Sequence, residues 1–323
     1  MRQSTGRHRR TRTVSIAAAV AVASGAGGVH LGLSNGGAQA AGATVTVSST
    51  AQLESAVRNA AAGTVIEVRG GTYYPSATLR STASGTPTSR ITLRARGGET
   101  VRVDGSRLPA GSWLAGIHGS YWTVENLTFQ KSPAQGLVVT SSTGGVFRNL
   151  VTASNGDSGF TLRGDNTVDN LVRNLDSHDN HAAGDGIAIT FGSGSGNVVD
   201  GARLHDNASD GIDLWQFSTP VTIRNSRAYG NGNGFNLGGG GAVVAHQVHD
   251  NTARDNTLHG FTENSNPGAI ALDANTARAN GQSGFHFPTG KARLTRNHAA
   301  DNKGGPAELG PSTVNEANTW DGE

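Results

Sequence analysis

The chain has 323 residues, with 47 glycines, no cysteine, 5% aromatic residues and a formal net charge of +2. The absence of cysteine excludes a disulfide framework and a cysteine-ligated zinc site. A composition this rich in glycine and poor in aromatic residues is typical of a turn-rich β protein with an aliphatic core.

The first forty residues differ from the rest. They carry five arginines and no acidic residue, an apolar run from Val14 to about Ala23, and the small-residue pattern Ala38-Gln39-Ala40. This order predicts that residues 1–40 are a secretion signal peptide. The apolar run is too short and too rich in alanine for a membrane anchor. We therefore expect a secreted, extracellular protein with no membrane attachment after cleavage.

Removal of this segment reverses the sign of the charge. Five of the 26 basic residues lie in it, which leaves 21 basic against 24 acidic residues and a net charge of −3. A net negative charge disfavours binding to the negatively charged phosphates of a nucleic acid. We expect no nucleic-acid partner, and we expect a monomer.

Residues 41–323 are predicted to form one domain that begins with a short helix. Ser49-Thr50-Ala51-Gln52 fits a capping box, Leu53, Val57 and Ala60 fall on one helical face, and Gly63 is a suitable stop. Such a helix would cap the first coil of a repetitive β structure. The first strand segments are predicted within residues 63–74, 90–93, 101–105 and 122–129.

Two ladders of residues recur with a period of 22 to 27 residues. Glycine followed by a large apolar residue occurs at Gly136, Gly159, Gly186, Gly211, Gly234, Gly260 and Gly284. In phase with it stand Asn155, Asn180, Asn207, Asn231, Asn256, Asn280 and Asn302. The units hold short apolar alternations and no helical pattern, so the predicted fold class is an all-β, right-handed parallel β-helix. The segment from Lys303 onward is expected to form a cap or tail.

Residues of equal phase should lie one above another in successive coils, and this brings acidic residues together. Asp185 and Asp210 each precede a repeat glycine, and Asp213 stands two residues after Gly211, where its side chain should point outward. Over the seven repeats from Gly136 to Gly284, no lysine or arginine occupies these columns. Since neighbouring carboxylates repel one another, an oxygen-ligated cation is expected here, and calcium suits an incomplete shell of oxygen ligands.

The segment from Ser209 to Gly241, followed by residues 260–272, resembles family nine of the polysaccharide lyases. The resemblance implies a secreted, calcium-dependent pectate lyase that acts on an acidic polysaccharide. It implies a calcium site at Asp185, Ser209, Asp210 and Asp213, with serine at 209 where the family usually has aspartate. It also implies a lysine base in the sequence NGNGFKLGG, and the matching residue here is Asn236.

With asparagine at position 236, the proton acceptor of the elimination is unassigned. Elimination on a uronic-acid polymer requires a base to remove the C5 proton, and an amide cannot accept it near neutral pH. Either another residue serves, with Arg224, Arg227 and His246 as candidates near in sequence, or the protein is a catalytically impaired carbohydrate-binding relative. Other β-helix functions, such as epimerase or hydrolase, remain a third alternative.

Further contacts to the substrate are predicted on three segments. Arg224 and Arg227 are candidates for binding the carboxylates of the substrate. Asn264 and Asn266 lie in a loop one coil beyond Asn236. Trp215 and Phe217 follow the acidic strand and offer aromatic faces to a sugar ring.

Overall fold

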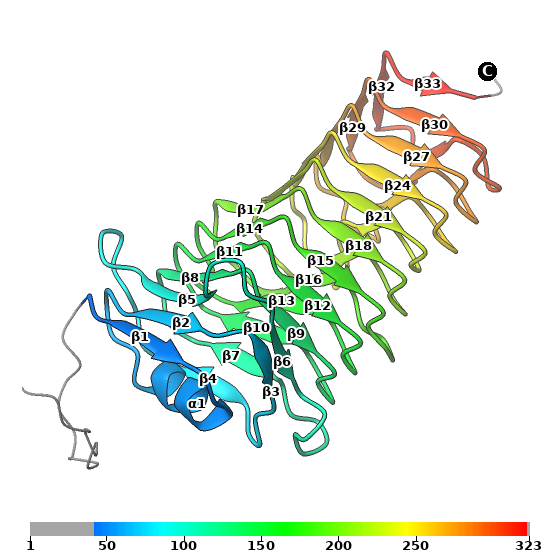
Figure 1. Ribbon diagram of the computed structural model, residues 1–323. Coiled ribbons are helices and arrows are strands. Elements are labelled where there is room, and N and C mark those ends of the chain that lie inside the picture. The colour runs from blue at the N-terminus through cyan, green and yellow to red at the C-terminus, as the bar shows by residue number, and fades with distance from the viewer. Residues whose placement is uncertain (1–41, 322–323) are drawn as a thin grey trace, which may run out of the picture. The chain divides into compact units, whose positions relative to one another are not determined.

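The computed structural model describes residues 42–321. The segment predicted to be a signal peptide lies outside these residues. The described chain winds as a stack of short coils, each contributing strands to three parallel sheets that run the length of the solenoid (Figure 1). Within residues 42–321 no helix has the length and apolar character needed to cross a membrane.

The 12-stranded sheet contains the first strand of each coil. Its members are β1 (Thr44–Val47), β2 (Val65–Val68), β5 (Ile91–Ala95), β8 (Trp122–Glu125), β11 (Val146–Arg148), β14 (Leu171–Arg173), β17 (Asn197–Asp200), β20 (Val221–Arg224), β23 (Gln247–His249), β26 (Ala271–Asp273), β29 (Arg293–Thr295) and β32 (Val314–Glu316).

The 11-stranded sheet follows it around each coil. Its members are β3 (Gly71–Tyr73), β6 (Val101–Asp104), β9 (Thr128–Gln130), β12 (Val151–Ala153), β15 (Asp176–His178), β18 (Arg203–His205), β21 (Arg227–Tyr229), β24 (Thr252–Arg254), β27 (Thr276–Arg278), β30 (His298–Ala300) and β33 (Thr319–Trp320).

The 10-stranded sheet completes the coil. Its members are β4 (Leu79–Ser81), β7 (Ala115–Ile117), β10 (Leu137–Thr140), β13 (Phe160–Gly164), β16 (Ile187–Gly192), β19 (Ile212–Asp213), β22 (Phe235–Asn236), β25 (Phe261–Thr262), β28 (Phe285–Phe287) and β31 (Ala307–Leu309). The repeat glycines stand directly before its strands, so the predicted period marks this sheet.

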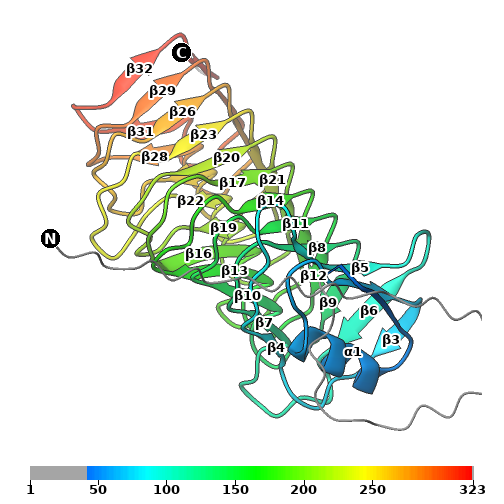
Figure 2. The same ribbon diagram turned by 90° about the vertical axis from the view of Figure 1, so that its left-hand side faces the viewer.

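The N-terminal end is closed by helix α1 (Thr50–Arg58), which packs against β4, β1 and β2 (Figure 2). The Ser49 side chain accepts a hydrogen bond from the Gln52 backbone, as a capping box requires, but Gln52 Oε1 accepts from Ser48 N rather than from Ser49 N. The helix ends at Arg58 with Asn59 as its C-cap, so the predicted stop at Gly63 is wrong.

The expectation of a cap or tail after Lys303 is also wrong. Strands β31, β32 and β33 continue the three sheets in register, and Trp320 packs against the buried ring of Phe285 at the end of the core. The polar composition of this segment goes with the exposure of its side chains, as at residues 314–317.

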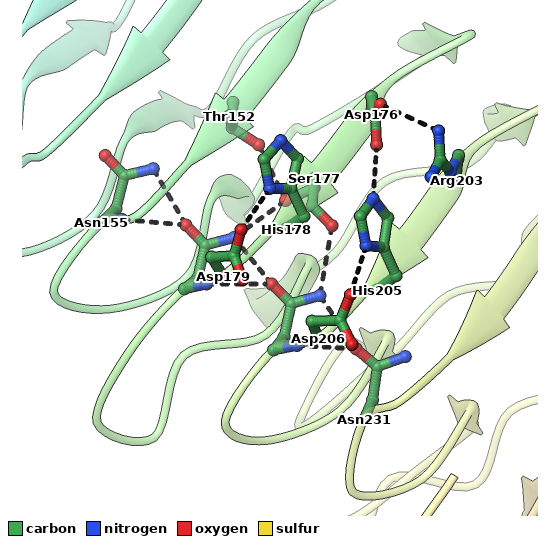
Figure 3. A network of polar contacts seen from close by, with 12 residues as sticks. Thr152, Asn155, Asp176, Ser177, His178, Asp179, Arg203, His205, Asp206 and Asn231 are labelled. Carbon is green, nitrogen blue, oxygen red and sulfur yellow. Dashed lines mark hydrogen bonds and ion pairs between the residues drawn. The ribbon is translucent and has the colours of Figure 1, made fainter. Parts of the chain in front are cut away.

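The asparagine ladder lies inside the coil turns, as predicted. Part of it, from Asn155 to Asn231, is drawn in Figure 3. Asn256 Nδ2 donates to Asn280 Oδ1 (2.9 Å) and to the Ala228 carbonyl, while Asn256 Oδ1 accepts from both the backbone and the side-chain nitrogen of Asn231. One amide therefore satisfies backbone groups that would otherwise be buried without partners.

A second ladder was not predicted. Asn251, Asn275, Asn297 and Asn318 repeat the same bonds at the corner between the 12-stranded and 11-stranded sheets, with Nδ2 to Oδ1 distances of 3.0 Å at each step. The core between the sheets is apolar, and its C-terminal half contains the stacked rings of Phe235, Phe261 and Phe285.

Replacing Asn256 with leucine should destabilise the protein. The substitution leaves the Asn231 backbone N–H and the Ala228 carbonyl buried without their side-chain partners, at roughly 1–3 kcal/mol for each group. Urea unfolding measures the loss. The matched control is Asn315→Leu, an exposed asparagine in the last coil, which we expect to change the unfolding free energy by no more than about 0.5 kcal/mol. Equal stability of the two variants would contradict a role for the ladder.

Candidate active site

The candidate site lies on the outer face of the 10-stranded sheet, and close approach between coils positions it. An ideal Cβ at Gly211 would lie 2.5 Å from the Gly234 carbonyl oxygen, and one at Gly234 would lie 2.6 Å from that of Gly260. Any larger residue would push the coils apart. The glycines therefore hold the residues around them in vertical columns.

The register confirms the two predicted columns. Ala188 pairs with Asp213, Asp213 with Asn236, and Asn236 with Thr262. In the column before the glycines, the backbone nitrogen of Asp210 donates to Asp185 Oδ1 (3.0 Å), and that of Asn233 donates to Asp210 Oδ1 (2.7 Å). The three aspartates thus come from two successive coils of one sheet face.

Asp185 and Asp210 are buried and Asp213 is half-buried, and the three carboxylates repel one another. Burial, together with the neighbouring charge of Asp210, raises the pKa of Asp185 to about 7 despite the hydrogen bonds that it accepts. Burial and the charges of Asp185 and Asp210 raise the pKa of Asp213 to about 8. Asp213 Oδ1 has no hydrogen-bond partner within residues 42–321. Among residues 42–321, no ion pair engages any of these three carboxylates.

The donor set fits a hard cation in its chemistry, because every donor is oxygen and one buried carboxylate oxygen is unpaired. The side chains are not already gathered around a common point: within residues 42–321 no three His, Asp or Glu groups are arranged as metal ligands. Both oxygens of Asp210 are engaged by amides, Oδ1 by Asn233 and Oδ2 by Asn236 Nδ2 (2.8 Å). Ser209 is half-buried and hydrogen-bonds Asp185.

Asn236 occupies the position where the resemblance implies a lysine base. Its side chain is buried, its nitrogen donates to Asp210, and its Oδ1 has no partner in the described part of the chain. The amide therefore ties down one carboxylate of the cluster. It offers no proton-accepting group.

The three residues proposed from sequence as substitute bases do not lie on this face. Arg224 belongs to β20 of the 12-stranded sheet and pairs with Asp200 (3.2 Å), and Arg227 is exposed on β21 of the 11-stranded sheet. His246 is fully buried, and its Nδ1 accepts the Val221 backbone N–H (3.2 Å) as the ladder asparagines do. These candidates are near Asn236 in sequence but lie on other parts of the coil, because the chain turns a corner on each side of the site.

Of the two substrate-contacting residues predicted in the loop after β25, only Asn264 lines a cavity at the site. Asn266 is fully buried, and its amide bonds four backbone groups of the loops around it, so no capacity is left for a ligand. Asn264 is half-buried and lines a cavity of about 420 Å³ together with Asn236. Phe217 is buried in the core, whereas Trp215 is exposed.

The same cavity contains two histidines that the sequence analysis missed. His259 stands one coil beyond Asn233 and its backbone N–H donates to Asn233 Oδ1 (3.2 Å); its ring stacks on His286 with centroids 4.1 Å apart. Nδ1 of His259 is buried with no partner in residues 42–321. Burial, and then the nearby His286, lower the pKa of His259. The sequence signal that could have identified His259 is its position directly before the repeat glycine Gly260. We call this space the histidine cavity.

A second cavity of about 260 Å³ lies on the other side of the cluster. Asp185 and Asp213 line it together with Arg163, Phe191 and Trp215. We call it the aromatic cavity. The acidic cluster thus stands between two hollows on one face of the solenoid.

Comparison with known proteins gives the family. The model of the Pel9A-like right-handed β-helix region matches residues 33–298, which is most of the chain. The chain belongs to this family. It is thus a member of a pectate lyase-like polysaccharide lyase family, and its right-handed parallel β-helix is the family fold.

Three similar proteins illustrate the family. Pectate lyase PEL9 of Emericella nidulans is 34% identical, with 84% of this chain and 78% of that protein covered. Pectate lyase L of Paenibacillus polymyxa is 33% identical, with 83% and 67% covered. The crystal structure of pectate lyase Pel9A superposes with a TM-score of 0.75 at 26% identity, covering 83% of this chain and 74% of that one.

His246 should make the protein less stable in mild acid. Burial lowers its pKa to about 4, below the ordinary 6.5, so the unfolded state binds the proton first and stability falls as pH drops from 6.5 towards 4. The full difference is about 3 kcal/mol. His246→Asn keeps a hydrogen-bond acceptor that does not titrate. Thermal melts of both proteins between pH 7 and 4 should show a smaller loss in the variant; parallel curves would contradict this assignment.

Proposed function

We propose that this protein is a secreted, calcium-dependent lyase that cleaves a uronic-acid polymer by β-elimination. Its membership of a pectate lyase-like family supports the reaction class. The single observation that carries the proposal is the buried, uncompensated cluster of Asp185, Asp210 and Asp213, with one carboxylate oxygen left unpaired. A bound cation would offset these charges, and a carboxylate of an acidic substrate could complete its oxygen shell.

In this proposal Asp185, Asp210 and Asp213 hold the calcium ion, with Ser209 beside them. When bound, calcium withdraws charge from the substrate carboxylate and so acidifies the adjacent C5 proton. Ser209 supplies a hydroxyl where the resemblance implies a further carboxylate, so the site carries one negative charge fewer. We expect weaker calcium binding than a four-carboxylate site would give.

We further propose His259 as the proton acceptor in place of the missing lysine. Its lowered pKa keeps the imidazole neutral at neutral pH, and it lines the same cavity as Asn236. The C5 proton passes to a ring nitrogen, the electrons of the C5–H bond form the C4–C5 double bond, and O4 leaves with the electrons of the C4–O4 bond. The departing O4 takes a proton from solvent.

A second candidate function follows from Asn236. Its nitrogen is bonded to Asp210, so the residue at the implied lysine position orders the cluster instead of accepting a proton. A protein with this site and no working base would bind acidic polysaccharide through calcium without cleaving it. Turnover separates the two functions.

Calcium should stabilise the wild-type protein by mass action: at a hundred times its Kd it should raise the free energy of unfolding by about 2.7 kcal/mol, and the unfolding temperature should rise with it. Differential scanning calorimetry in calcium and in EDTA measures the shift. The Asp210→Ala/Asp213→Ala double variant should lose it. Asp165→Ala, an exposed aspartate outside the cluster, is the control and should retain it. An equal shift in the double variant would place calcium elsewhere.

Incubation with polygalacturonate and calcium should produce unsaturated ends, followed by their ultraviolet absorbance. His259→Ala should lower the rate by about 10²–10⁴-fold, and the wild-type rate should fall at pH values below the ordinary imidazole pKa. His181→Ala, an exposed histidine in a turn before the site, is the matched control.

Asn236→Lys separates the two candidate functions. In a binding protein that lacks only its base, this substitution should create eliminase activity. In an enzyme that uses His259, it should change the rate little compared with loss of the histidine. A wild-type protein that is retarded in a pectate gel but forms no unsaturated ends favours the binding function.

A further inference from the structure

The aromatic cavity presents two aromatic rings to solvent in neighbouring coils. Among residues 42–321, Phe191 and Trp215 are the exposed large aromatic hydrophobic residues, at 56% and 38% exposure. The Phe191 backbone N–H donates to the Trp215 carbonyl (3.1 Å), so the two residues stand one coil apart. Both line the cavity beside Asp213. Exposed rings grouped in a hollow are typical of a binding site rather than of scattered surface residues.

The backbone positions both rings. Phe191 has a φ of +51°, and Ser141 and Gly164, which follow the same strand position in the two preceding coils, also have positive φ, so a recurrent left-handed turn at the end of the strand carries the Phe191 ring. The Trp215 ring packs over Gly239, where an ideal Cβ would lie 2.2 Å from Cε3 of the ring. A loop glycine therefore makes room for the indole. The rings are placed by the fold.

The polar groups of the cavity match a charged sugar. Arg163 lines it, and none of the ion pairs within residues 42–321 engages this guanidinium, which lies over the Trp113 ring at 5.7 Å. Thr161 is 5% exposed, lines the same cavity, and its buried hydroxyl has no partner in that part of the chain. An unpaired cation and an unpaired hydroxyl together suit a ligand with a carboxylate and hydroxyl groups.

More positive charge lies towards the N-terminal coils on the same face. Arg80 belongs to the column of Gly116, Val138, Thr161, Ala188 and Asp213. Arg80 and Arg163 both lie close enough to His118 to lower its pKa, after the effect of burial. Between Arg80 and Asp213 the column holds only small or short side chains.

We propose that the aromatic cavity is a uronate-binding subsite next to the cation site. A pyranose ring packs on Trp215 and Phe191, its carboxylate pairs with the Arg163 guanidinium, and a hydroxyl bonds Thr161. The polymer then runs along the solenoid axis from the Arg80 end, over the acidic cluster, to the histidine cavity. This inference rests on the proposed function, because it assumes that the substrate of the neighbouring site is a polyuronate.

Affinity electrophoresis of the full chain in gels containing polygalacturonate tests the subsite, with gels of methyl-esterified polymer for comparison. Trp215→Ala and Phe191→Gly should weaken retardation by both polymers roughly 3- to 10-fold. Arg163→Gln should weaken retardation by the charged polymer and leave that by the ester nearly unchanged. Phe191→Gly also relieves the backbone strain, so lost binding with undiminished thermal stability cannot be attributed to misfolding.

Two controls match these variants. Val243→Ala removes an apolar side chain that is 68% exposed and lines neither cavity. Arg102→Gln removes an exposed arginine of the 11-stranded sheet. Both should bind as the wild type does.

The possible results separate this inference from the proposed function. Wild-type retardation in all three variants of the subsite overturns the subsite and leaves the lyase proposal intact. Retardation that depends on Trp215, Phe191 and Arg163 in a protein that forms no unsaturated ends supports the subsite and overturns the lyase proposal. Loss of binding to the ester in Arg163→Gln as great as the loss to polygalacturonate overturns the assigned carboxylate contact.

Discussion

The structure depends on the register between successive coils, and buried asparagine amides hold that register. After the first member of each ladder, each Oδ1 accepts the backbone and side-chain N–H groups of the asparagine in the coil before it, as Asn256 does from Asn231. A slip of one residue would break every such pair and would turn Asp213 inward and Ile212 outward. With ladders at two corners of the coil, a slip at either is opposed. The functional columns inherit their alignment from these amides.

The close stacking of the coils also brings acidic side chains together at the site, and their repulsion costs free energy. Repeat glycines let one coil approach the next within van der Waals contact, and the residues beside them are brought together whatever their charge. At Asp185, Asp210 and Asp213 this places three acids in a partly water-excluded region, and their pKa values rise. Protons or a cation relieve the repulsion. The asparagine ladders stabilise the rest of the solenoid and so offset the free-energy cost of bringing these three acids together.

The face of the 10-stranded sheet divides into three parts along the solenoid axis. The aromatic cavity lies before the acidic cluster and the histidine cavity after it, and Asn236 stands at the boundary between cluster and histidines. An amide at this point holds Asp210 in place and leaves any proton transfer to a neighbouring coil. A proton acceptor can move from one coil to the next in a solenoid, because equivalent positions recur at one-coil intervals along the same face.

The sequence alone determined the fold, the ladder and the acidic cluster, because in a parallel β-helix a fixed spacing along the chain becomes a fixed contact between coils. It did not determine which way side chains point beyond a corner. Gln216 has a φ of +53°, which breaks the strand alternation, so Trp215 is exposed while Phe217 is buried. Asn225, at +53°, likewise carries the chain from the 12-stranded to the 11-stranded sheet between Arg224 and Arg227. The tertiary structure alone decided these directions, and with them the surroundings of His246, Asn266 and His259, because left-handed corner residues redirect the chain and include types such as Gln216 that do not mark a corner in the sequence.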